Sequence, residues 1–316
     1  MIALDANGAD RGPATVAEGG RLSGVPFTLF DSDVAITNED EPALAVRSNP
    51  DASIVQAARA VAEGSADALV SAGPTGATLA ASLFHLKRIR GVHRPAVALL
   101  LPIPGSPTLM LDVGANVEVR PDHLVQFAYM GSAFMEAVHG VERPRVGLLS
   151  VGEEPNKGTP DVVEAHERLR TGTLNFVGNV EGTDVTAGAA DVLVTDGFTG
   201  NVALKLMEGT AKTVVGAIRD AVRSGPLSSL GGLLIRGKVG GLREQLDPNT
   251  TGGAILLGVR GVAVIAHGSS SAEGIANAVR LARRAVDERM IERTAAALEA
   301  GGALRSAPAA SVGTNP

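Results

Sequence analysis

The chain has 316 residues, of which 45% are hydrophobic but only 3% are aromatic, and its formal net charge is −6. A core built from small aliphatic side chains suits a parallel sheet buried under helices, and the negative charge argues against a nucleic-acid partner, because phosphate backbones attract a basic face. The chain contains no cysteine, which excludes disulfides, thiolate metal ligands and a cysteine nucleophile.

The N-terminal stretch MIALDANGAD reaches an acid at its fifth residue, so we expect no signal peptide. No window holds about 18 consecutive uncharged apolar residues, the length that a membrane-spanning helix needs. Because a chain without cysteine suits a reducing compartment, we expect a cytoplasmic protein.

Short apolar runs alternate with helical patterns along the chain, and the runs predict strands. In chain order the predicted strands are 2–4, 27–30, 68–70, 97–101, 108–111, 146–150, 176–177, 192–195 and 262–266. One helix is predicted to begin at Ser48-Asn49-Pro50. Further helices are predicted to follow Gly73-Pro74-Thr75-Gly76, Pro121-Asp122, Thr159-Pro160-Asp161 and Gly200-Asn201. The last predicted helix runs from about Ser271 toward Glu299. Strands that alternate with helices favour right-handed crossovers, so the predicted fold is α/β, a three-layer α/β/α sandwich around a mostly parallel, Rossmann-like sheet.

The helix after Asn201 carries apolar residues with the spacing of a core-facing stripe, namely Val202, Leu206, Met207, Val214, Ile218 and Val222. Residues 225–248 break the alternation with a sparse leucine stripe that glycines interrupt, which predicts an amphipathic helical hairpin insertion. This hairpin either packs on the protein's own core or a second subunit, or contacts a membrane surface through its apolar tip with Arg236 or Lys238. Residues 301–316 are rich in small residues and predict a disordered tail, which leaves 1–300 as a single α/β domain.

Glycine-rich polar turns follow several predicted strands, namely DANGAD (5–10), SAGPTGA (71–77), DVGANVE (112–118), SVGEEPNKGT (150–159), TDGFTGN (195–201) and HGSSSA (267–272). In an open parallel sheet such turns lie along the carboxyl edge, where they converge. SAGPTGA and TDGFTGN lead directly into helices, whose first N–H groups lack partners and bind anions. The glycines let an anion approach the backbone closely, so these turns predict an anion pocket that needs no metal.

Charged and polar side chains define this pocket further. Lys157 lies in a loop after a buried strand. Lys205 lies four residues after Asn201, so that Asn201 and Lys205 point to one side of the first helical turn. For each lysine the alternative is a solvated surface charge, and for His267 it is a capping role beside the serines that follow. The chain has no GxSxG, no HExxH, no GxGxxG after its first strand and no cluster of metal ligands, which disfavours covalent serine catalysis, a nicotinamide and a metal ion.

Read together, these segments resemble the phosphate acyltransferase (PlsX) family of bacterial phospholipid synthesis. The resemblance rests on DANGAD, SAGPTGATLAA, LDVGANVE, GLLSVGEEPNKGT, ADVLVTDGFTGNVALKLMEG, TGGAILLGV and IAHGSSSAEGIANAV, in this order. It covers about residues 1–290, and TDGFTGNVALK and DVGAN are its most specific parts. Pro74 departs from the pattern, because the family usually has asparagine at that position.

The resemblance implies an acyltransferase that moves a fatty acyl group from the thioester of acyl carrier protein to inorganic phosphate, which yields acyl phosphate and needs no cofactor. It implies that Lys157 and Asn201 are the catalytic pair: Lys157 neutralises the phosphate or the oxyanion, and Asn201 orients it. Further phosphate- or substrate-binding residues are expected at Asp5, Gly73, Thr75, Gly76, Asp112, Asn116, Glu153, Asp196, Gly197, Thr199, Gly200, Lys205 and His267. Two alternatives stay open, namely a phosphate acetyltransferase-like enzyme that uses an acyl-coenzyme A, and a non-catalytic scaffold that binds acyl carrier protein.

The resemblance also implies a homodimer, and peripheral membrane contact through residues 225–248. Since acyl carrier protein is acidic, its docking on a chain of negative net charge requires a local basic surface. KRIRGVHR (87–94) is the densest basic stretch, and Arg236, Lys238 and Arg243 form a second candidate. The alternative for KRIRGVHR is a solvated helix end.

Overall fold

The structure is a computed structural model that describes residues 1–101, 103, 107–226, 228–231 and 250–304. Most of the predicted hairpin at 225–248 and most of the predicted tail at 301–316 lie outside the described residues. Arg236, Lys238 and Arg243 also lie outside them.

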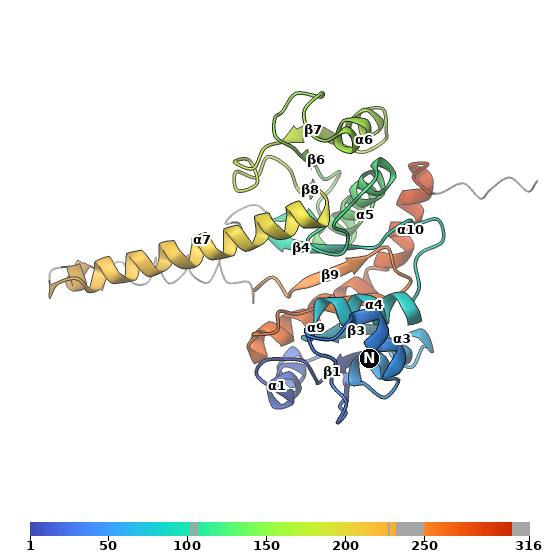
Figure 1. The fold of residues 1–316 in the computed structure, drawn as a ribbon, viewed down its shortest axis with the longest axis vertical. Coiled ribbons are helices and arrows are strands. Elements are labelled where there is room, and N and C mark those ends of the chain that lie inside the picture. The colour runs from blue at the N-terminus through green and yellow to red at the C-terminus, as the bar shows by residue number, and fades with distance from the viewer. Residues whose placement is uncertain (102, 104–106, 227, 232–249, 305–316) are drawn as a thin grey trace, which may run out of the picture.

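The described residues form one mixed sheet of ten strands with helices on both faces (Figure 1). The strands are β1 (Ile2–Asp5), β2 (Phe27–Phe30), β3 (Ala68–Ser71), β4 (Ala96–Leu101), β5 (Thr108–Leu111), β6 (Val146–Leu149), β7 (Phe176–Val180), β8 (Val192–Val194), β9 (Ala254–Leu257) and β10 (Val262–Ile265). Their order across the sheet is β2-β1-β3-β10-β9-β4-β5-β8-β6-β7. All predicted strands are present. Strand β9 is an additional strand that was not predicted, because its run AILL is short and lies between glycine turns.

The sheet consists of two parallel blocks that run in opposite directions. Strands β2, β1, β3 and β10 pair in parallel, and so do β5, β8, β6 and β7. Between the blocks, β9 and β4 pair antiparallel with each other and with their outer neighbours, so the strand direction reverses at the centre. The sheet is mostly parallel, as predicted. The expectation of one shared carboxyl edge is wrong, because the two blocks end at opposite edges.

The helices cover both faces of the sheet, as the three-layer prediction requires. They are α1 (Pro13–Ser23), α2 (Pro42–Ser48), α3 (Ser53–Ala62), α4 (Thr75–His85), α5 (Pro121–His139), α6 (Pro160–Arg170), α7 (Gly197–Arg223), α9 (Ala272–Asp287) and α10 (Met290–Ala300). One hydrophobic core lies between the sheet and α1, α5, α6, α9 and α10, and a second lies between the sheet and α2, α3, α4 and the start of α7. Because side chains alternate along a strand, Ile2 and Leu4 face the first core and Ala3 faces the second.

Two predicted helices differ in the structure. The helix predicted from Ser48-Asn49-Pro50 is α3, which begins later, at Ser53, and α2 before it was not predicted. The Asn49 side chain separates the two helices, because it donates to the Ala45 carbonyl at 2.9 Å at the end of α2. The long C-terminal helix is divided into α9 and α10 at Arg289, whose φ of 52° is left-handed.

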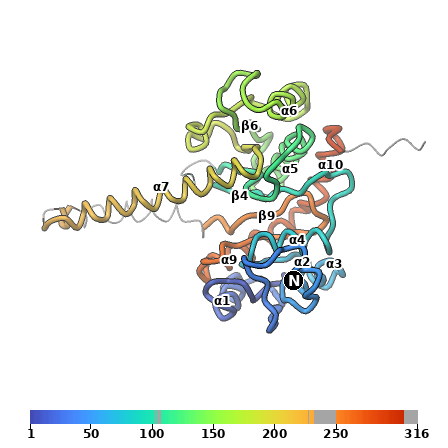
Figure 2. The backbone as a smooth tube through the Cα atoms, viewed as in Figure 1, coloured from blue at the N-terminus to red at the C-terminus, as the bar shows by residue number. Residues whose placement is uncertain are grey.

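Helix α7 extends far beyond the body of the molecule (Figures 1 and 2). Its buried residues are Gly197 and Gly200 in its first turn, whereas Leu206 is 68% exposed. The prediction that its apolar stripe faces this chain's own core is therefore wrong for most of the stripe. In the described part of the chain, no helix is both long and apolar enough to cross a membrane.

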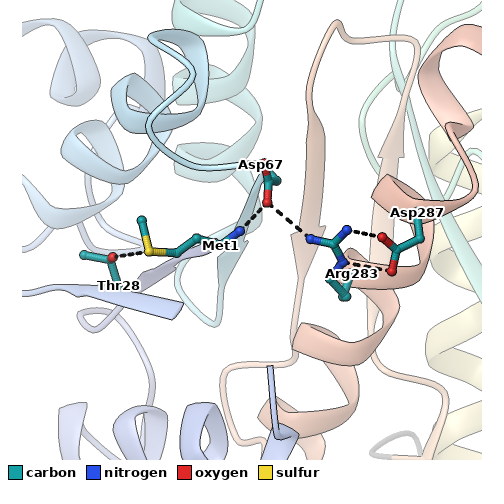
Figure 3. Close-up of polar contacts among 5 residues, drawn as sticks. All are labelled: Met1, Thr28, Asp67, Arg283 and Asp287. Carbon is teal, nitrogen blue, oxygen red and sulfur yellow. Dashed lines mark hydrogen bonds and ion pairs between the residues drawn. The ribbon is translucent and has the colours of Figure 1, made fainter. Parts of the chain in front are cut away.

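The amino ends of β1 and β3 are joined to α9 by ion pairs at the surface (Figure 3). The Asp67 carboxylate, one residue before β3, accepts from the α-ammonium group of Met1 and from Arg283 Nη1, the latter at 3.3 Å. Arg283 Nε also donates to Asp287 at 2.8 Å. Such exposed pairs each contribute little free energy, so they add little to the stability of the fold.

A buried carboxyl group fixes the turn between β3 and α4. The Asp5 side chain at the end of β1 is 2% exposed and accepts from the hydroxyl groups of Ser53, at 2.5 Å, and Ser71, at 2.6 Å. The Ser71 hydroxyl oxygen accepts in turn from the Gly73 N–H at 3.0 Å. Burial raises the pKa of Asp5 to about 6, against the opposing effect of these hydrogen bonds. Asp5 therefore holds the backbone of residues 71–73 through Ser71, and its predicted contact with substrate stays a prediction.

Replacement of Asp5 by asparagine is expected to remove a pH dependence from the stability of the fold. The folded-state pKa of about 6 lies above the ordinary value of 3.8, so the folded protein binds this proton more tightly than the unfolded chain does. As pH rises from 5 to 7, the free energy of unfolding should therefore fall by about 1 kcal/mol through this group. Urea titrations followed by circular dichroism should show the fall in the parent and a flatter profile in Asp5→Asn. Identical profiles would contradict the assignment.

Candidate active site

A cavity of about 270 Å³ lies where the two blocks of the sheet meet. Leu99 of β4 pairs with Ala254 of β9, which pairs with Ile265 at the end of β10, so the turn after β10 lies beside the middle of β4. The first turns of α4 and α7, which belong to different blocks, line the same cavity. Loops from both blocks therefore converge on one face of the central strands rather than along one edge.

The cavity combines polar groups with an apolar wall. Its polar lining comes from the two helix starts and the turn after β10: Thr75, Gly76, Asn201, Lys205, Glu208, His267 and Ser270. Its apolar lining includes Leu79, Val97, Leu99, Val113, Leu204 and Ile265. Such a lining accepts a small anion beside an aliphatic chain.

The Asp112 carboxylate organises the loop after β5. It is buried, and it accepts from the N–H groups of Val97 (3.1 Å), Gly114 (3.1 Å), Ala115 (3.0 Å) and Asn116 (2.7 Å). The Asn116 amide donates to it at 2.8 Å and to a backbone carbonyl at 2.7 Å. Burial raises the pKa of Asp112, while these bonds favour its ionised form. With its oxygens occupied in this way, Asp112 shapes the loop, and its predicted contact with substrate stays a prediction.

The first turn of α7 packs directly against that loop. The Asp196 carboxylate caps the helix, because it accepts from the Thr199 N–H at 2.8 Å and from the Thr199 hydroxyl at 2.7 Å. The Gly197 N–H donates to the Asn116 carbonyl at 2.7 Å. A Cβ at Gly200 would lie 2.0 Å from the Asp112 carbonyl oxygen. The absence of a side chain at Gly197 and Gly200 thus allows the neighbouring loop to pack closely, and an anion at these glycines stays a prediction.

This packing places Asn201 in the lining of the cavity. Its amide Nδ2 donates one hydrogen to the Val113 carbonyl at 3.1 Å, which fixes the orientation of the side chain. A Cβ at Gly114 would lie 3.1 Å from the same Nδ2 atom, so the loop closely confines the amide. Lys205 lines the cavity one helical turn further along α7.

The N-terminus of α4 differs from that of α7, because no side chain caps it. Its N-cap residue is Pro74, which has no side-chain acceptor, and no side-chain capping bond is present. Thr75 and Gly76 in its first turn line the cavity. Uncapped helix termini attract anions, and anion binding at this end of the cavity stays a prediction. Gly73 contributes through the Asp5 network, outside the lining.

The ring of His267 has a defined tautomer. Its Nδ1 accepts from the Ser269 N–H at 3.2 Å and lies 2.8 Å from the Ser269 hydroxyl. A nitrogen that accepts from a backbone N–H carries no proton, so the ring hydrogen is on Nε2. Ser271 caps α9 by accepting from the Gly274 N–H at 3.2 Å. His267 thus offers Nε2–H as a hydrogen-bond donor at the cavity, and Ser271 caps the helix that follows.

Lys157 and Glu153 lie in the loop after β6 and do not line the cavity. The Asn179 amide holds this loop by donating to the Glu154 carbonyl at 2.8 Å, and His166 contacts the Asn179 oxygen at 2.9 Å. Strand β6 pairs in parallel with β8, so the loop leaves the sheet beside the turn that leads to Asn201. The catalytic role of Lys157 stays a prediction.

Several lining residues were not predicted, although a signal for them exists in the sequence. Alternation along β4 places Val97 and Leu99 on one face, and helical spacing places Leu204 and Glu208 beside Asn201. Each pattern also fits an ordinary core or surface position, so only the fold distinguishes them. Among the described residues, no group of three His, Asp or Glu side chains is arranged to hold a metal ion.

The fold is shared with solved acyltransferases. A branched-chain phosphotransacylase from Enterococcus faecalis has a TM-score of 0.56 at 18% identity, and the match covers 90% of this chain and 99% of that one. A phosphotransacetylase from Streptococcus pyogenes has a TM-score of 0.55 at 17% identity, with coverage of 95% and 94%. At these identities the likeness concerns the fold alone.

Sequence relatives are much closer. A family model described as fatty acid synthesis protein matches residues 24–293. A phosphate acyltransferase from Heliobacterium modesticaldum is 44% identical over 92% of this chain and 95% of that protein. A phosphate acyltransferase from a Geobacillus species is 45% identical over 94% and 98%. Such identity over nearly the full length of both proteins confirms the resemblance in the turns, and the chain belongs to the phosphate acyltransferase family.

Proposed function

We propose that this protein transfers a fatty acyl group from the thioester of acyl carrier protein to inorganic phosphate and releases acyl phosphate. The observation that carries the proposal is the cavity, in which an uncapped helix N-terminus, Asn201, Lys205 and His267 share an apolar wall. Membership of the phosphate acyltransferase family supports the same reaction.

Phosphate is expected at the N-terminus of α4. The N–H groups near Thr75 and Gly76 offer hydrogen bonds and a partial positive charge, and Lys205 supplies a full charge from the lining of the same cavity. Because hydrogen phosphate is already anionic near neutral pH, it attacks without a strong general base. Binding beside the thioester then provides catalysis by positioning.

The reaction balances without a cofactor. An oxygen of hydrogen phosphate attacks the thioester carbonyl carbon, the C–S bond breaks, and the departing thiolate takes up the phosphate proton. Negative charge develops on the carbonyl oxygen in between, where hydrogen-bond donors lower the barrier. Asn201 Nδ2, which retains a second hydrogen, and His267 Nε2–H are the expected donors. Lys157, from the adjacent loop, is proposed to neutralise the phosphate or this oxyanion.

The apolar wall favours a fatty acyl group over a short one. Leu79, Val97, Leu99, Leu204 and Ile265 provide an aliphatic surface, whereas an acetyl group would leave most of it in contact with water. The alternative is an enzyme of the phosphate acetyltransferase type that takes the acyl group from coenzyme A. The preferred acyl donor, carrier protein or coenzyme A, distinguishes these two enzymes. A non-catalytic scaffold would differ from both because it would form no acyl phosphate.

A homodimer is proposed through α7. Four apolar side chains of this helix are exposed, namely Val202 (50%), Leu206 (68%), Val214 (50%) and Ile218 (41%). Neighbouring members of this set lie four or eight residues apart in the sequence. A stripe of this kind on a projecting helix is typical of a surface that another chain covers. Peripheral membrane contact through residues 225–248 is also proposed, on the sequence pattern and the family.

We expect Asn201→Ala and Lys157→Ala each to reduce acyl phosphate formation by about 100-fold or more. Each variant loses a side chain that would stabilise the negative charge developing in the transition state. Purified variants would be incubated with acyl carrier thioester and labelled phosphate, and label in acyl phosphate would be counted. Lys212→Ala, an exposed lysine on α7 outside the cavity, is the matched control and should keep the parental rate. Parental rates in both test variants would remove this assignment, and no product from the parent itself would favour the scaffold.

Leu206→Asp with Ile218→Asp is expected to convert a dimer to a monomer, because a charge in an apolar interface is left unpaired. Sedimentation velocity would give the mass, and circular dichroism would show that α7 still forms. A monomeric parent, or a variant that stays dimeric, would exclude this interface.

A further inference from the structure

A basic surface lies one helix length from the cavity. The C-terminal end of α4 leads into Lys87, Arg88, Arg90 and Arg94, all of which are exposed. Helix α4 has 11 residues and therefore spans about 16 Å, and its other end contributes Thr75 and Gly76 to the cavity.

The fold adds basic residues from two distant segments to this stretch. The turn between β9 and β10 runs alongside it, since the Arg260 N–H donates to the Lys87 carbonyl and the Ile89 N–H donates to the Gly258 carbonyl, both at 2.9 Å. The start of α5 approaches Arg94, since the His93 and His123 rings lie 5.7 Å apart and Arg120 precedes α5. Burial lowers the pKa of His123, and so do the positive charges of His93, Arg94 and Arg120. We call the exposed side chains Lys87, Arg88, Arg90, Arg94, Arg120 and Arg260 the basic rim.

The basic rim is not neutralised by this chain. In the part of the chain that the structure describes, none of its side chains forms an ion pair with a carboxylate. Residues 87–94 and 258–261 contain no acid. The nearby Asp122 is already paired with Arg168 at 2.8 Å. This cluster of positive charge on a chain of net charge −6 is therefore available to a partner.

The surface of the basic rim is hollowed, and its end at Arg94 lies close in sequence to the wall of the cavity. A hollow of about 400 Å³ is lined by Leu83 and residues 87–92, so apolar side chains lie between the basic ones. Arg94 is three residues from Val97, which lines the cavity. Asn116, from the loop that packs on α7, donates to the Pro95 carbonyl at 2.7 Å. A partner that contacts Arg94 thus lies next to Pro95, whose carbonyl holds the loop that positions Asn201.

We propose that the basic rim is the docking surface for the acidic acyl carrier protein, whose thioester arm reaches the cavity from there. The proposal rests on the proposed function, which requires a donor delivered on a protein. Charge complementarity supplies rapid and specific encounter, because an acidic partner is otherwise repelled by a negatively charged chain. A bilayer is a poor occupant, since a flat surface does not enter a hollow. A nucleic acid is disfavoured by the net charge.

Arg90→Glu with Arg94→Glu is expected to raise the KM for acyl carrier thioester at least tenfold at low salt and to leave kcat within twofold. With acyl-pantetheine, a small uncharged thioester, the variant should match the parent. Arg143→Glu is the matched control, because this exposed arginine follows the far end of α5, a helix of 19 residues that spans about 28 Å. Arg143→Glu should keep the parental KM, and thermal melts should be equal for all three proteins.

Direct binding completes the test. The Kd of carrier protein without an acyl group should rise steeply with salt in the parent and much less in Arg90→Glu with Arg94→Glu. An unchanged KM and Kd in this variant would overturn the docking surface, while product from the parent would leave the reaction standing. No product from the parent with either thioester would instead refute the proposed function. Loss of binding to anionic vesicles with unchanged carrier binding would assign the basic rim to a membrane and overturn the proposal.

Discussion

The antiparallel pair of β9 and β4 at the centre of the sheet is the constraint on which the cavity depends. In a sheet that is parallel throughout, helices and turns from every strand would leave at one edge. Here the direction reverses, so a turn from one block and a turn from the other meet over the face of β4. The reversal brings the start of α4 and the start of α7 to the same cavity, although they come from opposite blocks.

A buried carboxylate fixes the turn on each side of this cavity. Asp5 holds the turn into α4 through Ser71, and Asp112 holds the loop that packs under α7. Burial of an acid is unfavourable on its own, as the raised pKa values of both groups indicate, and the hydrogen bonds that each accepts offset the penalty. These hydrogen bonds restrict the backbone of the two turns that lie on either side of the cavity.

The two helix starts then have different tasks. The terminus of α7 is occupied by Asp196 and by the loop carbonyls, so it serves as a rigid support for Asn201. The terminus of α4 is uncapped, and its partial charge faces the cavity. The glycines that look alike in the sequence therefore act differently. Those of α7 accommodate a neighbouring backbone, whereas Gly76 lines the cavity and accommodates the Pro42 side chain, which would lie 2.8 Å from a Cβ there.

The sequence by itself determined the α/β class, the family and the polar turns, because hydrophobic alternation and glycine positions are local properties of the chain. It also indicated Thr75, Gly76, Asn201, Lys205 and His267, which the structure brings to one cavity. Only the tertiary structure decided the reversal at β9, which depends on pairing between segments far apart in sequence. Likewise, only the fold showed that Gly200 meets the Asp112 carbonyl, that the stripe of α7 is exposed, and that Arg120 and Arg260 join residues 87–94. Each of these results from contacts across the fold that no local pattern encodes.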